Sequence, residues 1–351
     1  MTTTSKTLVP VGDPARVIGL FADHIRDDHD MVFDTAEDGS RYIDQDGFRL
    51  EMRAEPNGLR VTIKAPHESA LVFFKEEFVK HVAELDPVAA GQIRWSGETA
   101  TVGSLPPNFR VLEVVGGRAV FPGLLRVTLR HEEASGLGIG GIHLRLMLPL
   151  RRDRRPVWPR MAENGTPVWP TGDDTLHARF ITLRHVRPNE VDIDIVDHDG
   201  GLIAEWARKA QPGGRVGVMG PAGETSLPVK TGLFLAADAT GIAAVARMME
   251  AAGPDVEGHA AIAATSLAVA RDYLRKSRLS IEALPQVRFE DEIVGRAKAL
   301  TKFGVTQYAF FAGEFQNAQD LRAQFKRELG LGKNAQLSTA YWRRGVPGFG
   351  G

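Results

Sequence analysis

The chain has 351 residues, which is enough for two or three domains with sizeable cores. Its 43 lysine and arginine residues nearly balance 44 aspartate and glutamate residues, and the net charge of −1 argues against broad nucleic-acid binding. Cysteine is absent, which excludes disulfides, cysteine-ligated zinc and iron–sulfur clusters. No apolar run approaches the roughly 18 residues of a membrane span, and the N-terminus lacks the apolar segment of a signal peptide. We therefore expect a cytoplasmic protein whose redox chemistry, if any, uses an organic cofactor.

The first hundred residues predict a small α+β domain, residues 1–100. Residues 17–26 predict a short helix, and Leu71, Phe74, Phe78 and Val82 follow the spacing of an amphipathic helix that covers one face of a sheet. Alternating apolar residues separated by turns predict an antiparallel meander with strands at 42–43, 48–52 and 59–63. Residues 93–95 predict a last strand.

This domain contains His24, His29, His67 and His81. Metal binding by these residues is one interpretation, but their spacing matches no standard ligand pattern, so we expect ordinary surface or interface histidines and no bound metal. The residues alone do not indicate what the domain does.

Residues 98–108 contain Gly103, Ser104, Pro106 and Pro107, which indicate a domain boundary. Short strands broken by glycine and proline follow and predict a small antiparallel barrel over residues 108–228. The expected barrel strands are 109–115, 124–130, 142–148, 179–182, 191–196 and 215–219. Between the last two, Gly200 and Gly201 precede a short helix, whose unpaired first N–H groups suit a phosphate.

Four arginines fall within residues 151–155. Clustered guanidinium groups suit an anionic partner because their geometry matches phosphate and carboxylate. A charge run of this kind is equally typical of a solvated loop, and the sequence leaves both interpretations open.

Residues 229–351 alternate apolar strands with helices, which predicts an α/β domain with a parallel sheet. A weaker strand is expected at 287–289. Ligands of such sheets bind at the carboxyl ends of the strands, which points to 238–241, 265–266 and 313–314. The dinucleotide fingerprint G-x-G-x-x-G is absent from residues 229–351.

Several motifs, in order, resemble the siderophore-interacting proteins, which are ferric-siderophore reductases of the ferredoxin–NADP reductase-like superfamily. They are Arg-x-x-Thr-x-Arg at 179–184, His-x-Gly-Gly at 198–201, Asp-x-Thr at 238–240, Ala-Gly-Glu at 312–314 and Tyr-Trp-Arg-x-Gly at 341–345. The segment 141–149 is similar to the family's His-Val-Lys-Leu strand that leads to a proline. The N-terminal region resembles a small domain of unknown function that occurs fused to these proteins.

The resemblance implies FAD on the barrel and NAD(P)H on the C-terminal domain. It places Arg179 near the flavin phosphates and the Thr182 hydroxyl near the ring N5, where Thr182 is the expected catalytic residue. The implied cofactor-binding residues are Arg179, Phe180, Ile181, Thr182, His198, Gly200, Gly201, Ile203, Ala204, Asp238, Thr240, Gly313, Glu314 and Trp342. Arg343 and Arg344 are the expected substrate-binding residues, with the arginine loop as a further candidate.

Two positions depart from the family pattern. Ile181 replaces a tyrosine that packs on the flavin ring, and Ala204 replaces a serine whose hydroxyl suits a phosphate. We expect these changes to bear on how tightly FAD binds, while backbone amides of residues 203 and 204 remain available.

The expected function is electron transfer from NAD(P)H through FAD to the Fe(III) of a bound siderophore, with release of Fe(II). Two alternatives stay open: an NAD(P)H:flavin reductase, and a non-catalytic siderophore-binding or regulatory protein with a decayed flavin site. The sequence does not indicate which siderophore, which nicotinamide cofactor or which oligomeric state applies.

Overall fold

The computed structural model describes residues 2–29, 31–45, 47–97, 101–151, 153–222, 232–252, 255–274, 279–301, 306–346 and 348. The chain forms two compact units. The first contains Met1–Arg110, Pro149–His177 and Gly217–Glu224, and the second contains Val111–Leu148, Ala178–Val216 and Thr225–Gly351. The three-domain division expected from the sequence stays a prediction.

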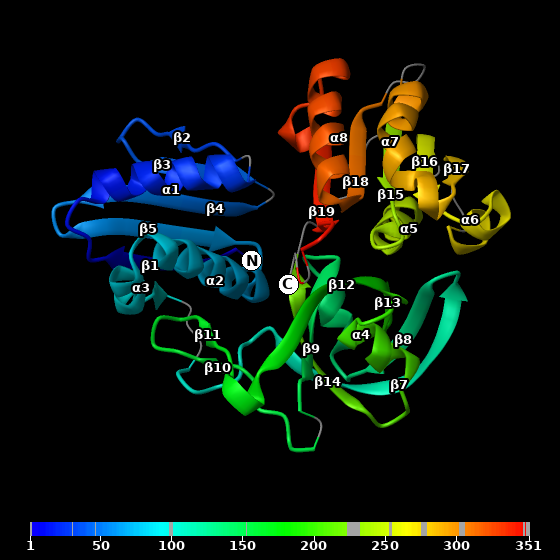
Figure 1. Ribbon diagram of the computed structural model, residues 1–351. Coiled ribbons are helices and arrows are strands. Elements are labelled where there is room, and N and C mark those ends of the chain that lie inside the picture. The colour runs from blue at the N-terminus through cyan, green and yellow to red at the C-terminus, as the bar shows by residue number, and fades with distance from the viewer. Residues whose placement is uncertain are drawn as a thin grey trace. The chain divides into compact units, whose positions relative to one another are not determined.

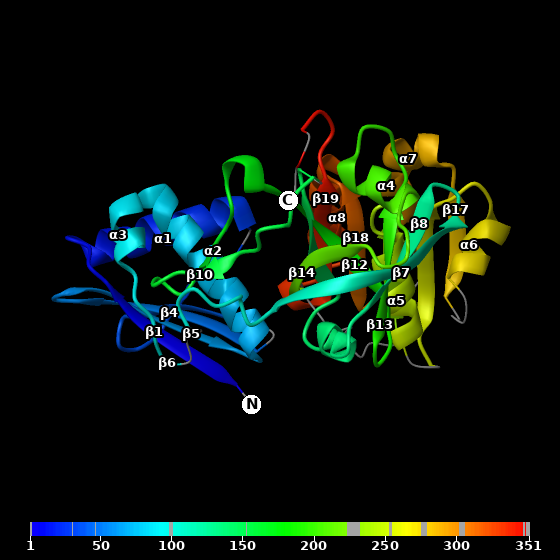
Figure 2. The same ribbon diagram turned by 90° about the horizontal axis from the view of Figure 1, so that it is seen from below.

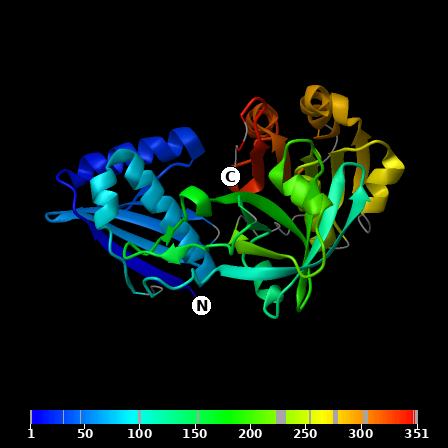
Figure 3. The same cartoon turned by 60° about the horizontal axis from the view of Figure 1, so that its bottom comes forward.

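The N-terminal region is a six-stranded antiparallel sheet in the order β2-β3-β4-β5-β1-β6. Its strands are β1 (Thr3–Val9), β2 (Asp34–Thr35), β3 (Arg41–Gln45), β4 (Phe48–Glu55), β5 (Gly58–Ala65) and β6 (Ser96–Gly97). The helices α1 (Pro14–His29), α2 (Glu68–Leu85) and α3 (Pro87–Gln92) lie over one face of this sheet (Figure 3). The expected meander and the helix on its face are confirmed.

Two details of this region differ from the sequence prediction. Strand β1 was not predicted, although it pairs with β5 along its whole length, because its buried face includes Ser5 and Thr7 and therefore lacks an apolar alternation. Residues 93–95 are not a strand: Ile93 follows α3 as its C-cap, and the short strand begins at Ser96.

Six strands close an antiparallel barrel in the order β12-β13-β8-β7-β14-β9, as expected from the short strands between glycines and prolines. They are β7 (Phe109–Phe121), β8 (Leu124–Arg130), β9 (His143–Pro149), β12 (Leu176–Val186), β13 (Glu190–Val196) and β14 (Arg215–Ala222). The long strand β7 pairs with β8 along most of its length (Figure 2). The short helix α4 (Leu202–Arg208) follows β13, and β10 (Arg160–Met161) pairs with β11 (Pro167–Val168).

The C-terminal region is a five-stranded parallel sheet in the order β17-β16-β15-β18-β19. The strands are β15 (Gly232–Ala237), β16 (Glu257–Ala263), β17 (Ser280–Leu284), β18 (Tyr308–Glu314) and β19 (Gln336–Trp342). From β15 the chain adds β16 and then β17 on one side of that strand, and it then adds β18 and β19 on the other side. The strand order therefore reverses between β15 and β18. In parallel sheets this reversal is the position at which ligands bind.

Helices cover both faces of the parallel sheet (Figure 1). One apolar cluster contains α5 (Ile242–Ala251) and α6 (Leu267–Tyr273), and another contains α7 (Gln286–Thr301) and α8 (Phe315–Glu328). The first cluster also includes Phe121 and Leu124 of the barrel, so barrel and sheet share a core within the second unit. The strand expected at 287–289 is wrong, because these residues lie in α7 and the strand is β17.

None of the described helices is both long enough and apolar enough to span a membrane.

Candidate functional site

Strand β12 carries the first four predicted flavin residues. Arg179 is half-buried, and its Nη1 donates to the carbonyl of Ala178 at 2.6 Å. Within the described residues Arg179 has no carboxylate partner, and burial lowers the pKa of its guanidinium. The C-terminal segment passes beside it, since a Cβ on Gly348 would lie 3.1 Å from Nη2 of Arg179. A half-buried guanidinium without a counter-ion is suited to an anionic ligand.

Phe180 on the same strand is half-buried. Thr182 is almost completely buried, and its side chain forms a hydrogen bond with Tyr341 of β19. The Tyr341 hydroxyl also lies 2.7 Å from Nε2 of His143 on β9. Burial raises the pKa of Tyr341, which keeps this hydroxyl protonated. The predicted catalytic threonine is therefore part of a group of three side chains from β9, β12 and β19, in which Thr182 is buried and the other two are half-buried.

His143 in this group is held in its neutral form. Burial, together with the nearby charge of Arg247, lowers the pKa of His143 from 6.5 to about 4. A neutral imidazole can donate to or accept from Tyr341, whereas a charged imidazole would face an additional desolvation penalty.

This depressed pKa predicts a pH-dependent loss of stability. The unfolded chain protonates His143 near 6.5 and the folded chain only near 4, so stability is complete above pH 6.5 and falls as pH decreases between these values. Full protonation costs about 3 kcal/mol of unfolding free energy. Between pH 7.5 and 4 the wild type should lose about 3 kcal/mol more unfolding free energy than His143→Gln, because the variant lacks the titrating imidazole. Urea unfolding at each pH measures this difference. If the unfolding free energies of the two proteins fall equally with pH, His143 does not have the lowered pKa described here.

The predicted nucleotide residues meet at the reversal between β15 and β18. Asp238 follows β15 and is buried, and its Oδ1 accepts hydrogen bonds from the backbone N–H of Thr240 at 2.8 Å and from its hydroxyl at 2.5 Å. Its Oδ2 accepts from the Trp342 indole N–H at 2.7 Å. Burial raises the pKa of Asp238 and these hydrogen bonds oppose the rise. A Cβ on Gly313 would lie 2.8 Å from Oδ2, so glycine permits this close packing. Asp238 and Thr240 thus shape the turn.

Glu314 also bonds to the protein itself. Its carboxylate caps α8 by accepting from the backbone N–H groups of Gln316 at 2.5 Å and Asn317 at 3.4 Å. The other oxygen accepts from the Arg344 backbone N–H at 3.2 Å. The carboxylate therefore fixes the segment after β19, which makes it a positioning group for the C-terminal residues.

The two predicted substrate arginines lie in different surroundings. The exposed guanidinium of Arg344 pairs with Glu290, whereas that of Arg343 lies over the ring of Phe315 at 4.5 Å. Among the described residues, Arg343 has no carboxylate partner. Its charge is therefore available to an anion, while that of Arg344 is partly neutralised.

The turn before α4 has the open backbone expected of a phosphate site. Gly200 has a φ of +75°, which favours glycine, and a Cβ on Gly201 would lie 2.4 Å from the His198 ring. Gly201 caps α4 without a side-chain hydrogen bond, and the side chains of Ile203 and Ala204 are buried. No hydrogen bond within the described residues joins this turn to Arg179 or Thr182.

The arginine loop is largely ion-paired. Arg151 pairs with Asp153 at 2.8 Å and Asp173 at 3.2 Å, and Arg154 pairs with Asp174 at 3.2 Å. Arg152 lies outside the described residues. These acidic partners reduce the net positive charge of the loop and weaken the interpretation of it as an anion-docking surface.

A polar cavity that the sequence did not indicate lies elsewhere in the second unit. It has a volume of about 650 Å³ and none of the predicted site residues lines it. The lining includes Arg126 and Arg184, which form bidentate ion pairs with Asp194 and with Glu250. The Tyr273 hydroxyl donates to the same Asp194 carboxylate at 2.5 Å. These contacts join the barrel strands to α5 and α6.

Two family models match this architecture in the expected order. The description of the first is siderophore-interacting FAD-binding domain, and it matches residues 113–225; the second, siderophore-interacting protein, matches residues 231–345. The chain belongs to the siderophore-interacting protein family. The barrel corresponds to the family's FAD-binding domain, and the parallel sheet corresponds to its second domain.

Named relatives of this siderophore-interacting protein agree with the match. Ferric vibriobactin reductase ViuB of Vibrio cholerae is 26% identical over 245 residues, covering 67% of this chain and 90% of that protein. An NADPH-dependent ferric-chelate reductase of Escherichia coli is 32% identical over 146 residues, covering 41% of this chain and 57% of that protein. A siderophore utilization protein from T. fusca has a similar crystal structure, with TM-score 0.58, 27% identity, and coverage of 70% of this chain and 97% of that one.

The donor set of this siderophore-interacting protein fits a flavin dinucleotide. Arg179 offers an uncompensated charge, and the start of α4 offers backbone N–H groups that no side chain caps. The half-buried Ile181 offers an apolar surface without an aromatic ring, and Ala204 leaves its position without a hydroxyl.

Sequence reasoning did not assign roles to His143 and Tyr341. Both belong to quoted motifs, but their contact joins residues 198 positions apart, and no local pattern encodes it. The motif Tyr-Trp-Arg-x-Gly is the signal in the sequence that points to Tyr341, because it places this residue directly before Trp342.

Proposed function

We propose that the chain is a flavin-dependent ferric-siderophore reductase that takes electrons from NAD(P)H and releases Fe(II) from the siderophore. Hard oxygen ligands hold Fe(II) less tightly than Fe(III), so reduction frees the metal. Two relatives are named ferric vibriobactin reductase and NADPH-dependent ferric-chelate reductase, and their names support this reaction class.

The observation that carries the proposal is the pair of adjacent residues Tyr341 and Trp342 at the end of β19. Tyr341 bonds Thr182 on the predicted flavin strand, and Trp342 bonds Asp238 at the β15–β18 reversal. Tyr341 is the extra residue at a register shift between β18 and β19. The different partners of Tyr341 and Trp342 mean that one strand end links both predicted cofactor sites within the second unit. This linkage supports direct transfer between a nucleotide and a flavin.

In the proposed enzyme the protein positions the reactants and supplies no general acid or base. A bound FAD would supply the redox chemistry, which is acceptance of a hydride from the reduced nicotinamide and one-electron donation to Fe(III). Arg179 would hold the flavin phosphates, and the neutral His143 and Tyr341 would hold the Thr182 hydroxyl in place for the flavin. Asp238, through Trp342 and Thr240, fixes the turn that receives the nicotinamide nucleotide.

An NAD(P)H:flavin reductase is the second candidate, and the departures at Ile181 and Ala204 favour it. Without an aromatic partner and a serine hydroxyl, flavin binding loses part of its expected affinity. Reduced flavin would then leave the protein and reduce ferric chelates in solution.

A single assay separates these candidates. Purified protein is titrated with FAD, NADPH or NADH is added without oxygen, and a ferric siderophore is supplied with a ferrous-specific chromogenic chelator. A bound reductase gives a rate that saturates with ferric siderophore at stoichiometric flavin. A flavin reductase requires excess free flavin and shows no such saturation, and a protein without flavin binding gives no bleaching of the flavin absorbance.

The geometry of the two arginines predicts unequal effects on substrate binding. Arg343→Ala should raise KM for an anionic ferric siderophore roughly two- to fivefold with little change in kcat, because an exposed charge contributes about 1 kcal/mol or less. Arg344→Ala should have a smaller effect because that guanidinium pairs with Glu290. An uncharged ferric chelate serves as the control substrate. Equal KM values for wild type and Arg343→Ala would remove Arg343 from the substrate site.

A further inference from the structure

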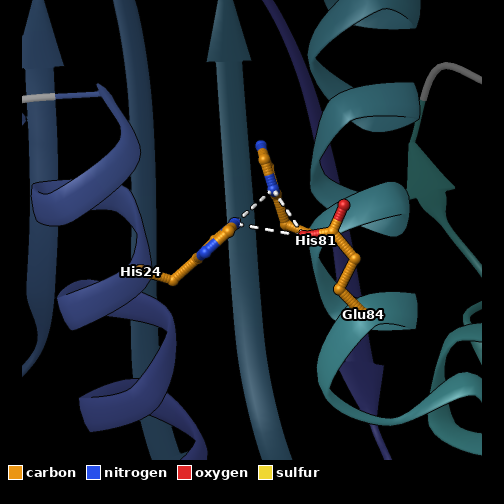
Figure 4. A group of neighbouring side chains, drawn as sticks. All are labelled: His24, His81 and Glu84. Atoms are coloured by element: carbon orange, nitrogen blue, oxygen red, sulfur yellow. Dashed lines mark hydrogen bonds and ion pairs between the residues drawn. The ribbon is translucent and has the colours of Figure 1, made fainter.

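Two helices of the N-terminal region bring three metal-ligand side chains together. His24 lies on α1, and His81 and Glu84 lie three positions apart on one face of α2 (Figure 4). His24 and His81 are 57 residues apart in the sequence, so spacing alone could not reveal the group. The sequence prediction of ordinary surface histidines therefore needs to be reconsidered for these two; the side chain of His29 lies outside the described residues.

The distances match those of a metal centre before an ion enters. Nε2 of His24 lies 2.9 Å from Nδ1 of His81 and 3.2 Å from Oε2 of Glu84, and Nδ1 of His81 lies 3.7 Å from the same oxygen. Ligand atoms at 2.0–2.2 Å from a tetrahedral zinc ion are separated by about 3.4 Å. The three observed distances lie on either side of this value, so binding an ion requires the ligand atoms to move by only a few tenths of an ångström.

The surroundings suit a site that is rigid on one side and open on the other. The His81 side chain is 10% exposed and packs edge-on against the ring of Phe21, within the core below α1 and α2. His24 is 23% exposed and Glu84 48% exposed, so solvent reaches the carboxylate. Three protein ligands on packed helices with an open side leave room for a water or another small ligand on the ion.

We propose that His24, His81 and Glu84 bind a divalent first-row transition metal ion. Two imidazoles and one carboxylate suit zinc, ferrous iron, cobalt and nickel, whereas calcium and magnesium prefer oxygen ligands alone. The ion takes a lone pair from each of the two facing ring nitrogens, and the imidazole that donates the hydrogen bond changes tautomer so that its proton moves to its other ring nitrogen. Metal binding then joins α1 to α2 more firmly than the hydrogen bonds do.

The test uses the full chain after removal of metals with a chelator. Cobalt(II) is titrated and its visible ligand-field absorption recorded, and zinc and, without oxygen, ferrous iron are then used to displace it. We expect one equivalent of cobalt, displaced by zinc or ferrous iron. His24→Ala and Glu84→Gln should each weaken binding at least tenfold, as expected for loss of a ligand in a metal site.

Asp23→Asn is the matched control because Asp23 is an exposed carboxylate next to His24 that pairs with Arg26 outside the group. It should bind cobalt like the wild type. Glu84→Gln preserves the shape of an exposed side chain, and a wild-type circular dichroism spectrum and melting temperature will establish that it is folded. Absence of the cobalt absorption in the wild type, or full binding by both ligand variants, would overturn the proposal. The test needs no flavin and no reductase activity, so its result is separate from the proposed function.

Discussion

Asp194→Ala is expected to lower the free energy of unfolding by about 3–5 kcal/mol, because it leaves a buried charge without its partner. The Asp194 side chain is 0% exposed and Arg126 is 11% exposed, and two hydrogen bonds of 2.7 Å join them. The variant also leaves the Tyr273 hydroxyl without its acceptor. Urea unfolding followed by circular dichroism measures the loss.

The chain contains a matched control on the same two strands. Arg130 and Glu190 face each other across β8 and β13, as Arg126 and Asp194 do, but their side chains are 53% and 30% exposed. Glu190→Ala should cost about 1 kcal/mol or less because solvent screens an exposed pair. The double variant Arg126→Met/Asp194→Leu should recover much of the lost stability by replacing the charges with apolar groups. If Asp194→Ala is as mild as Glu190→Ala, the Asp194 carboxylate does not join the barrel to α6 as we describe.

Arg179→Ala is expected to weaken FAD binding roughly 10- to 100-fold, because a hydrogen bond to a charged group contributes about 1.5–3 kcal/mol. The guanidinium is half-buried and has no carboxylate partner within the described residues, so its removal does not leave a buried carboxylate unpaired. Arg179→Lys should fall between wild type and alanine, since it keeps the charge and loses the planar fork. Flavin fluorescence titration gives the dissociation constants.

Riboflavin and a second arginine make this test specific. Riboflavin has no phosphate, so its affinity should be nearly the same for Arg179→Ala and wild type. Arg215→Ala, which removes an exposed arginine of the barrel strand β14, should leave FAD affinity unchanged. An equal loss for FAD and riboflavin would mean that Arg179 supports the fold of β12 and does not bind phosphate.

The sequence predicted the fold wherever its periodicity reflected burial. The barrel strands alternate and the parallel strands β15, β16 and β18 are short apolar runs, and these strands were predicted, whereas β19 was not. The error at 287–289 arose because Val287 and Phe289 alternate like a strand, although Phe289, Ile293 and Ala297 follow the helical spacing of the buried face of α7. The edge strand β17 (Ser280–Leu284) is only five residues long and gave a weak signal.

The candidate site was predictable only in its local parts. Motifs identified Arg179, Thr182, Asp238 and Trp342 because each stands in a short sequence pattern. The roles of Asp238 and Glu314 in shaping turns and caps depend on partners that only the folded chain supplies. The same holds for the Arg184–Glu250 pair and for the His24–His81 contact, which join residues 66 and 57 positions apart.

Anaerobic stopped-flow mixing tests the central claim most directly, because it follows the flavin and the iron in one experiment. Protein loaded with one equivalent of FAD is mixed with NADPH or NADH and then with a ferric siderophore in the presence of a ferrous-specific chelator. The account predicts bleaching of the flavin by the nicotinamide, then recovery of its absorbance as the ferrous complex forms at a rate that saturates with siderophore. A flavin that stays oxidised with both nicotinamides, or a reduced flavin that ferric siderophore does not reoxidise, would contradict it.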